Sequence, residues 1–229
     1  MQPKPTTTET PVCIPRDIVL QAAMIRLGSV DEELQAGYNV IRKYHKTVTV
    51  FGSARTPEGE RYYEAARLAG QKLAEQGYAI ITGGGHGIME AANRGAYEAD
   101  GDSIGFNITL PHEQTLNRYT TDSLSFSHFS PRKIAMTLYA DAYVYFPGGF
   151  GTLDEMMEIL TLIQTGKTGK APVILYGTEF WKPLDQFIRT QMLEKERLIS
   201  AGDELLYHIT DDVNEVVRLA RANKTYCDH

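Results

Sequence analysis

The chain has 229 residues, 42% of them hydrophobic and 23% charged, so it is long enough to bury a full core without disulfides or metal ions. A formal net charge of -6 at pH 7 argues against general electrostatic binding of DNA, RNA or an anionic membrane. The two cysteines, Cys13 and Cys227, lie near opposite ends and lack CxxC or Cys/His ligand spacing, so neither a disulfide framework nor a zinc site is indicated, and we expect no metal.

The first residues are rich in proline and threonine and carry little apolar content. Residues 1–15 are therefore expected to form a flexible tail. This stretch lacks the basic and then apolar pattern of a secretion signal, and no later run reaches the roughly 18 apolar residues of a membrane span. Together with the sparse cysteines, these features predict a cytoplasmic protein.

The next stretch, 16–46, is predicted to be an N-terminal helical segment. Its apolar residues recur at helical spacing up to Tyr44 and indicate one or two amphipathic helices, interrupted near Gly28 and Ser29. We expect this segment to pack on the core or on a second subunit.

From Thr47 onward, short apolar runs alternate with amphipathic stretches. Strands are expected at 47–54, 78–85, 102–110, 123–129, 142–149 and 172–177, and helices at 61–77, 88–100, 131–142, 152–167, 181–196 and 212–222. Nearly continuous apolar strands separated by helices are typical of a parallel sheet covered on both faces. The sequence therefore predicts a doubly wound, Rossmann-like α/β fold, with 47–229 as one nucleotide-binding catalytic domain.

Three of the predicted strands end in glycine-rich turns. In such a sheet, glycine at the carboxyl end of a strand lets the backbone approach a phosphate, and the next helix presents free N–H groups. The alternative is that tight turns need glycine only for their backbone conformation. The candidate binding residues in these turns are Gly52, Ser53, Gly84, Gly85, Gly148, Gly149 and Gly151.

The glycine spacing also bears on the kind of ligand. Counting GxGxxG from Gly83 places Ile88 at the last glycine, and the phosphate-loop pattern GxxxxGK[ST] is absent. These departures favour a mononucleotide over a dinucleotide or a hydrolysable triphosphate.

Two cations stand where a helix is expected to begin. Ser130 and Pro131 resemble an N-cap and a first helical residue, which places Arg132 and Lys133 in the first turn. Cations at a helix amino end are unfavourable by about 0.3 to 1 kcal/mol each unless an anion is nearby. We expect Arg132 to meet a ligand phosphate, ribose or carboxylate, whereas for Lys133 extension into water is an equal alternative.

The turn after the strand at 142–149 leads into a threonine and two acids. Thr152 is expected to cap the following helix, and the spacing from Thr152 to Glu155 matches a capping box, in which the glutamate bonds back to the cap. Asp154 would then be an ordinary first-turn acid. Spacing slightly favours this structural interpretation of Glu155. A chemical role requires Glu155 to meet Arg132 across a bound sugar.

Taken together, these motifs resemble a known family. GSAR (52–55), GGGHGIMEAANRGAYEA (83–99), PRK (131–133), PGGFGTLDE (147–155) and LTLIQTGK (160–167) are similar to the Lonely Guy (LOG) family of cytokinin riboside 5′-monophosphate phosphoribohydrolases. The resemblance covers about 47–222, and the preceding helical segment is similar to the longer, second type within the family. Many members carry the label "lysine decarboxylase", although no pyridoxal site is visible in this sequence.

The resemblance implies an activity and a site. The activity is hydrolysis of the N9–C1′ bond of AMP or of an N6-modified AMP, giving free base and ribose 5-phosphate without a metal or other cofactor. The loop at 148–151 and Thr152 would hold the phosphate, and Arg132 and Glu155 would be the catalytic pair. Weaker candidates for substrate binding are Ser53, Lys133, Asp154 and Thr161.

This assignment has a physical basis. Breaking a glycosidic bond builds positive charge on the ribose, which a carboxylate can stabilise. A nearby guanidinium keeps that carboxylate ionised.

Two positions depart from the family pattern, and other functions stay open. Pro131 stands where longer members often have an aliphatic residue, and His86 where proline is common, which leaves the preferred base open. We expect His86 and His112 to be surface or loop histidines. The alternatives to an enzyme are a nucleotide-binding carrier or sensor and, less favoured by the acidic charge, a single-stranded DNA-binding protein.

Family members self-associate, and the apolar faces of segment 16–46 and of helix 152–166 fit this behaviour. We therefore predict at least a homodimer.

Overall fold

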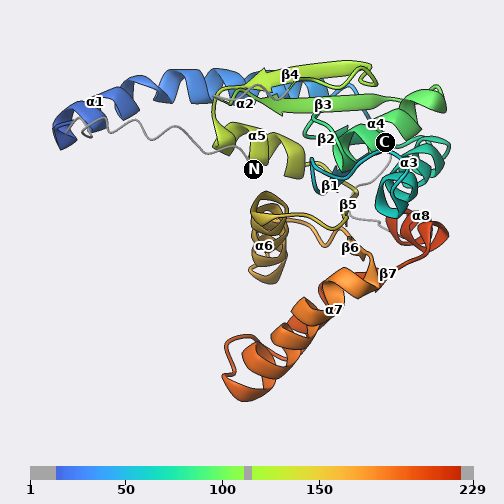
Figure 1. Ribbon diagram of the computed structural model, residues 1–229. Helices are drawn as coiled ribbons and strands as arrows, with labels where there is room; N and C mark the ends of the chain where they lie inside the picture. Colours follow the sequence, from blue (N-terminus) through green and yellow to red (C-terminus); the bar gives the residue numbers. More distant parts are fainter. Residues whose placement is uncertain (1–13, 111–114, 223–229) are drawn as a thin grey trace, which may run out of the picture.

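The computed structural model describes residues 14–110 and 115–222 (Figure 1). Within these residues, seven parallel strands form one sheet in the order β4-β3-β2-β1-β5-β6-β7. The prediction of a doubly wound, Rossmann-like α/β fold is confirmed. Nearly all of the expected tail and His112 lie outside the described residues.

The strands lie close to the predicted positions, with one addition. Their bounds are β1 (Thr47–Phe51), β2 (Ala79–Thr82), β3 (Ser103–Ile108), β4 (Asp122–Phe126), β5 (Ala142–Tyr145), β6 (Val173–Tyr176) and β7 (His208–Thr210). Every residue of β1, β2, β3 and β5 is buried, as expected for strands covered on both faces. The three-residue β7 was not predicted, because it is too short to show a pattern.

Helices cover both faces of the sheet (Figure 1). One face carries α3 (Arg61–Ala74), α4 (Ile88–Glu98) and α8 (Val213–Arg221), and the other carries α2 (Leu27–Ile41), α5 (Phe129–Thr137), α6 (Phe150–Gln164) and α7 (Thr178–Phe187). Successive strand residues point to opposite faces, so Val144 packs with the first group and Tyr145 with the second. Each face therefore has its own apolar core.

The N-terminal segment is helical, as expected, but its break lies elsewhere. Helix α1 (Arg16–Ile25) has Arg26 as its C-cap and α2 begins at Leu27, so Gly28 is inside α2. In Figure 1 the two helices form a rod whose α1 end extends beyond the sheet. None of the ten residues of α1 is buried.

The predicted helix at 181–196 is composed of two parts. Helix α7 begins at Thr178 and continues into a π-helical segment, η1 (Ile188–Lys195); a single 3₁₀ turn, η2 (Asp203–Leu205), precedes β7. Across residues 14–110 and 115–222, no helix has the length and apolar character needed to cross a membrane.

Candidate active site

A cleft lies where the chain changes direction within the sheet. β1 and β5 are neighbours, yet the chain leaves β1 toward β2, β3 and β4 and leaves β5 toward β6 and β7. The loops after these two strands diverge, and ligands of open α/β sheets bind at this point. The cleft has a volume of about 670 Å³ and is lined by residues from loops 52–55 and 149–152 and by the side chains of Arg132, Asp154 and Glu155.

The turn after β1 joins the glycine turns to one another. The Ser53 N–H donates to the Pro147 carbonyl at 3.0 Å, and the Ser53 carbonyl accepts from the Ile88 N–H at 3.0 Å. A Cβ on Gly52 would lie 2.6 Å from the Ile88 side chain, so glycine is required there for close packing. The structure places both Gly52 and Ser53 in the cleft.

The start of α6 also borders the cleft. A Cβ on Gly149 or Gly151 would meet no protein atom within 4 Å, and neither residue has a positive φ. Their lack of side chains is therefore not explained by the packing of the chain, but it does leave room for a ligand against the backbone. The first N–H groups of a helix lack intrahelical acceptors and attract anions.

Helix α6 begins earlier than the sequence suggested. It starts at Phe150 with Gly149 as N-cap, so Thr152 is inside the first turn and the prediction that Thr152 caps the helix is wrong. The capping-box interpretation of Glu155 is wrong as well, because it requires Thr152 at the N-cap position. Glu155 lies beyond the first turn, its side chain is 9% exposed, and its Oε2 has no hydrogen-bond partner among the described residues.

Helix α5 also begins earlier than predicted. It starts at Phe129 with His128 at the N-cap position, so Ser130 is not the cap and Pro131 is not the first helical residue. Arg132 therefore lies just beyond the point at which the helix dipole acts most strongly. A charge partner for Arg132 has to be sought in its three-dimensional surroundings.

That partner is Glu155. Arg132 Nη1 lies 3.9 Å from Glu155 Oε1, and the two side chains are only 12% and 9% exposed. Arg132 Nε donates to the Phe106 carbonyl at 2.7 Å, which fixes the guanidinium plane. A Cβ on Gly83 would lie 2.5 Å from Arg132 Nη2, so Gly83 leaves space for the guanidinium. Two residues separated along the chain thus meet in one cleft.

The electrostatics of the pair are dominated by burial. Burial raises the pKa of Glu155 to about 7, against the opposing effects of Arg132 and Lys133. Burial also lowers the pKa of Arg132, while Glu155 raises it, and a guanidinium stays protonated under either influence. The Glu155 carboxyl is therefore poised to change its charge near neutral pH, which is typical of a catalytic group.

Several predicted site residues lie elsewhere. The Gly84 N–H donates to Thr82 Oγ1, and the carbonyls of Gly84 and Gly85 accept hydrogen bonds from Asn117, so these two glycines shape their turn from within. Thr161 donates to the Met157 carbonyl and lines a separate depression. The expectation that these three residues contact the ligand is not supported by their positions.

The other predicted residues have structural partners. Gly148 packs against the Thr152 side chain, and a Cβ on residue 148 would collide with that side chain. Lys133 forms ion pairs with Asp154 and Glu158. His86 is an exposed side chain whose Nδ1 lies 2.8 Å from Glu90 Oε2, in agreement with its expected place on the surface.

Comparison with known proteins decides the family. A family model described as "Possible lysine decarboxylase" matches residues 89–220, which is more than half of the chain. The chain belongs to this family. Curated relatives carry the name cytokinin riboside 5′-monophosphate phosphoribohydrolase, so the resemblance to the LOG family is confirmed. The protein from rice (Oryza sativa subsp. japonica) is 30% identical over 64% of this chain and 61% of its own length. That from Rhodococcoides fascians is 28% identical over 65% of this chain and 77% of its own length.

Solved structures share the fold, and one of them is named as a carrier protein. The X-ray structure of TM1055 is 27% identical, with a TM-score of 0.58 over 77% of this chain and 98% of that chain. The molybdenum cofactor carrier protein of Chlamydomonas reinhardtii is 26% identical, with a TM-score of 0.56 over 77% of this chain and 96% of that chain. The LOG-type fold therefore accommodates proteins named for carrying as well as proteins named for hydrolysis.

Some residues of this LOG-family cleft were missed by sequence reasoning. Arg55 lines the cleft, and its side chain makes no hydrogen bond or ion pair within the part of the chain that the structure describes. Phe129 and Phe150 also line it, and Phe150 is 93% exposed. Arg55 belongs to the GSAR motif, so a signal for it was present. The two aromatic residues have no pattern that separates them from core residues.

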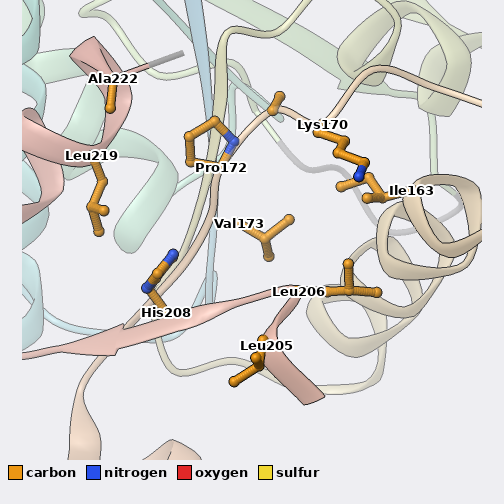
Figure 2. Close-up of a pocket in the computed structure, with 10 residues that line it drawn as sticks. Ile163, Lys170, Pro172, Val173, Leu205, Leu206, His208, Leu219 and Ala222 are labelled. Carbon is orange, nitrogen blue, oxygen red and sulfur yellow. The ribbon is translucent and has the colours of Figure 1, made fainter. Parts of the chain in front are cut away.

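A second cavity, of about 500 Å³, shares no lining residue with this cleft. Figure 2 shows the residues that line it. Val173 and His208 line it and are the first residues of β6 and β7, so it is at the amino ends of the strands. Its lining is mainly apolar, with Lys170 and His208 as the side chains that can carry charge. Ligands of this class of sheet bind at the carboxyl ends, so we assign the chemistry to the cleft.

Proposed function

We propose that this protein hydrolyses the N-glycosidic bond of a nucleoside 5′-monophosphate, with AMP or an N6-modified AMP as substrate. The observation that carries the proposal is the convergence of Arg132 and Glu155, both buried and 3.9 Å apart, in a cleft bordered by the start of α6. A cleft that only binds a nucleotide does not need a buried carboxylate beside a buried guanidinium.

The phosphate fits the start of α6. The N–H groups near Gly149 and Gly151 offer an anion site that a side chain at either position would narrow. The Thr152 hydroxyl is a further donor on the same turn, and Arg55 supplies a positive charge from the loop after β1. This site suits one phosphate group, in agreement with the prediction of a mononucleotide.

The reaction uses the pair as follows. Cleavage of the N9–C1′ bond leaves the electron pair on the base and positive charge on the ribose, and the ionised Glu155 stabilises that charge. Water then adds its hydroxyl to C1′, and its proton balances the departing base. Arg132 favours the ionised form of Glu155 and binds the sugar. No metal or cofactor takes part in these steps.

A carrier or sensor is the second candidate, favoured by the similarity to the Chlamydomonas reinhardtii molybdenum cofactor carrier. The two functions differ in turnover. The protein should be incubated with AMP, GMP, CMP, UMP and isopentenyl-AMP, and the free base and ribose 5-phosphate measured by chromatography. Catalytic release of adenine or isopentenyladenine supports the hydrolase. Stoichiometric binding of the same nucleotides without release would favour the carrier.

The pH dependence of base release follows from the Glu155 pKa of about 7. Because the reaction needs the ionised carboxylate, kcat/KM should fall about tenfold per pH unit below that pKa and level off above it. The phosphate of the substrate has its second pKa near 6, so its protonation should cause a separate decrease in kcat/KM at lower pH. A profile that is flat from about pH 5.5 to 8.5 would contradict the assignment of Glu155.

We also propose that the chain assembles at least as a dimer. Helix α1 has five large apolar side chains that are all more than half exposed, namely Ile18, Val19, Leu20, Met24 and Ile25. Light scattering coupled to size-exclusion chromatography should give a mass of at least two chains. The double variant Leu20→Ser/Met24→Ser should weaken assembly if the N-terminal segment is the interface. A monomer at micromolar concentration would contradict the proposal.

A further inference from the structure

Lys133 links the two helices that carry the proposed catalytic pair. Its Nζ lies 2.8 Å from Asp154 Oδ2 and 2.7 Å from Glu158 Oε2, and its side chain is only 17% exposed. Lys133 belongs to α5, whereas both carboxylates belong to α6. One ammonium group therefore bridges the two helices through two ion pairs.

These three residues are placed around the pair in a regular way. Lys133 directly follows Arg132, Asp154 directly precedes Glu155, and Glu158 lies about one helical turn further along. Residues four apart on a helix share a face, so Asp154 and Glu158 receive the same ammonium. The bridge thus fixes α5 against α6 at the level of Arg132 and Glu155.

We propose that Lys133 is a positioning residue, whose bridge to Asp154 and Glu158 holds α5 and α6 at the separation that lets Arg132 and Glu155 act together. Its catalytic consequence rests on the proposed hydrolase function. The proposal replaces the expectation that Lys133 and Asp154 bind substrate. The Lys133 ammonium and the Asp154 carboxylate pair with each other. A displacement of about 1 Å between catalytic groups such as Arg132 and Glu155 can lower the rate about a hundredfold.

The charges around Glu155 allow the bridge to be separated from simple electrostatics. Arg132 and Lys133 face Glu155 from α5, Asp154 and Glu158 from its own helix, and Tyr145 from β5. Lys133 lowers the pKa of Glu155, whereas Asp154 and Glu158 raise it. Removing the lysine and removing its acids therefore have opposite effects on the charge of Glu155 but the same effect on the bridge.

The test compares Lys133→Met, Lys133→Arg, Asp154→Asn and the pair Asp154→Asn/Glu158→Gln. Assays with AMP at about pH 9 keep Glu155 ionised in every variant. Lys133→Met and the double variant should each lower kcat about 10- to 100-fold, with KM changed less than about threefold. Lys133→Arg should retain most of the wild-type rate. Adding Lys133→Met to the double variant should cost little more, because the same bridge is already lost.

Other outcomes would overturn the proposal. A raised KM with unchanged kcat in Lys133→Met would make Lys133 a substrate ligand. Opposite effects of the lysine and acid variants on kcat would leave only the electrostatic role. The matched control is Lys195→Met, since Lys195 pairs with Glu196 at 3.1 Å on the exposed surface and should be replaceable without loss.

A readout without activity keeps the two proposals apart. In a crystal structure of Lys133→Met, the distance from Arg132 Nη1 to Glu155 Oε1 should be longer than in the wild-type crystal. An unchanged distance would overturn the positioning role even if base release is observed. Absence of base release by the wild-type protein would instead refute the proposed function, while the crystallographic distance still decides the role of Lys133.

Discussion

Glu155→Gln is expected to lower kcat for base release from AMP by about a thousandfold or more. The amide keeps the size of the side chain but cannot carry the negative charge that stabilises the ribose as the N9–C1′ bond breaks. Because the proposed role lies in the transition state, AMP should still bind with a KM within about threefold of the wild type. Steady-state kinetics with chromatographic detection of adenine measures both quantities.

Thermal unfolding provides the control for folding. The raised pKa of Glu155 means that the folded protein holds a proton, from about pH 4.5 to about pH 7, that the unfolded chain has lost. This contribution to the free energy of unfolding is fully present below the unfolded pKa and is lost as the pH rises through the folded pKa. The Glu155→Gln variant should lack this pH-dependent contribution to the free energy of unfolding and still unfold cooperatively. If Glu155→Gln keeps more than about a tenth of the wild-type kcat, the catalytic role of Glu155 is refuted.

Arg132→Met is expected to lower kcat about 100- to 1000-fold. The change removes the guanidinium, which favours the ionised form of Glu155 and whose Nε donates to the Phe106 carbonyl. The acid limb of the pH profile should therefore move to higher pH, because Arg132 lowers the pKa of Glu155. Measuring kcat/KM from about pH 6 to 10 tests both effects.

Two further variants sharpen the result for Arg132. Lys cannot reproduce a guanidinium that contacts a carbonyl and a carboxylate at once, so Arg132→Lys should recover only part of the lost rate. Arg189 is the matched control, because it pairs with Asp185 at 2.9 Å on a surface away from the cleft. Arg189→Met should keep the wild-type kcat. If Arg132→Met changed only KM, Arg132 would be a binding residue and not part of the chemistry.

The sheet and the place of the site could be predicted because both depend on strong local signals. Buried strands such as β1 and β5 have nearly continuous apolar sequences, and glycines mark where they end. The carboxyl ends of parallel strands lie on one edge, so the glycine turns and the residues after them had to gather there. The grouping of Gly52, Gly149 and Gly151 in one cleft follows from this rule.

The helix starts could not be predicted, because the residue at the N-cap position depends on where the preceding turn enters the helix. The Thr152-to-Glu155 spacing fits a capping box, yet Gly149 takes the N-cap place, since the turn after β5 enters the helix three residues earlier. In α5 the N-cap is His128, two residues before the expected Ser130, which moves Arg132 further from the helix start. Short elements such as β7 and the partners of Lys133 depend on contacts between distant segments, which no local pattern records.

The positions of Arg132 and Glu155 on either side of β5 have a further consequence. Both residues come from one uninterrupted stretch, α5, β5 and α6, whereas Arg55 and Met89 enter the cleft from earlier parts of the chain. The proposed catalytic pair and the lining contributed by Arg55 and Met89 are thus encoded by separate portions of the gene. Residues 55 and 89 can therefore be replaced, in evolution or in the laboratory, without altering the stretch that carries Arg132 and Glu155.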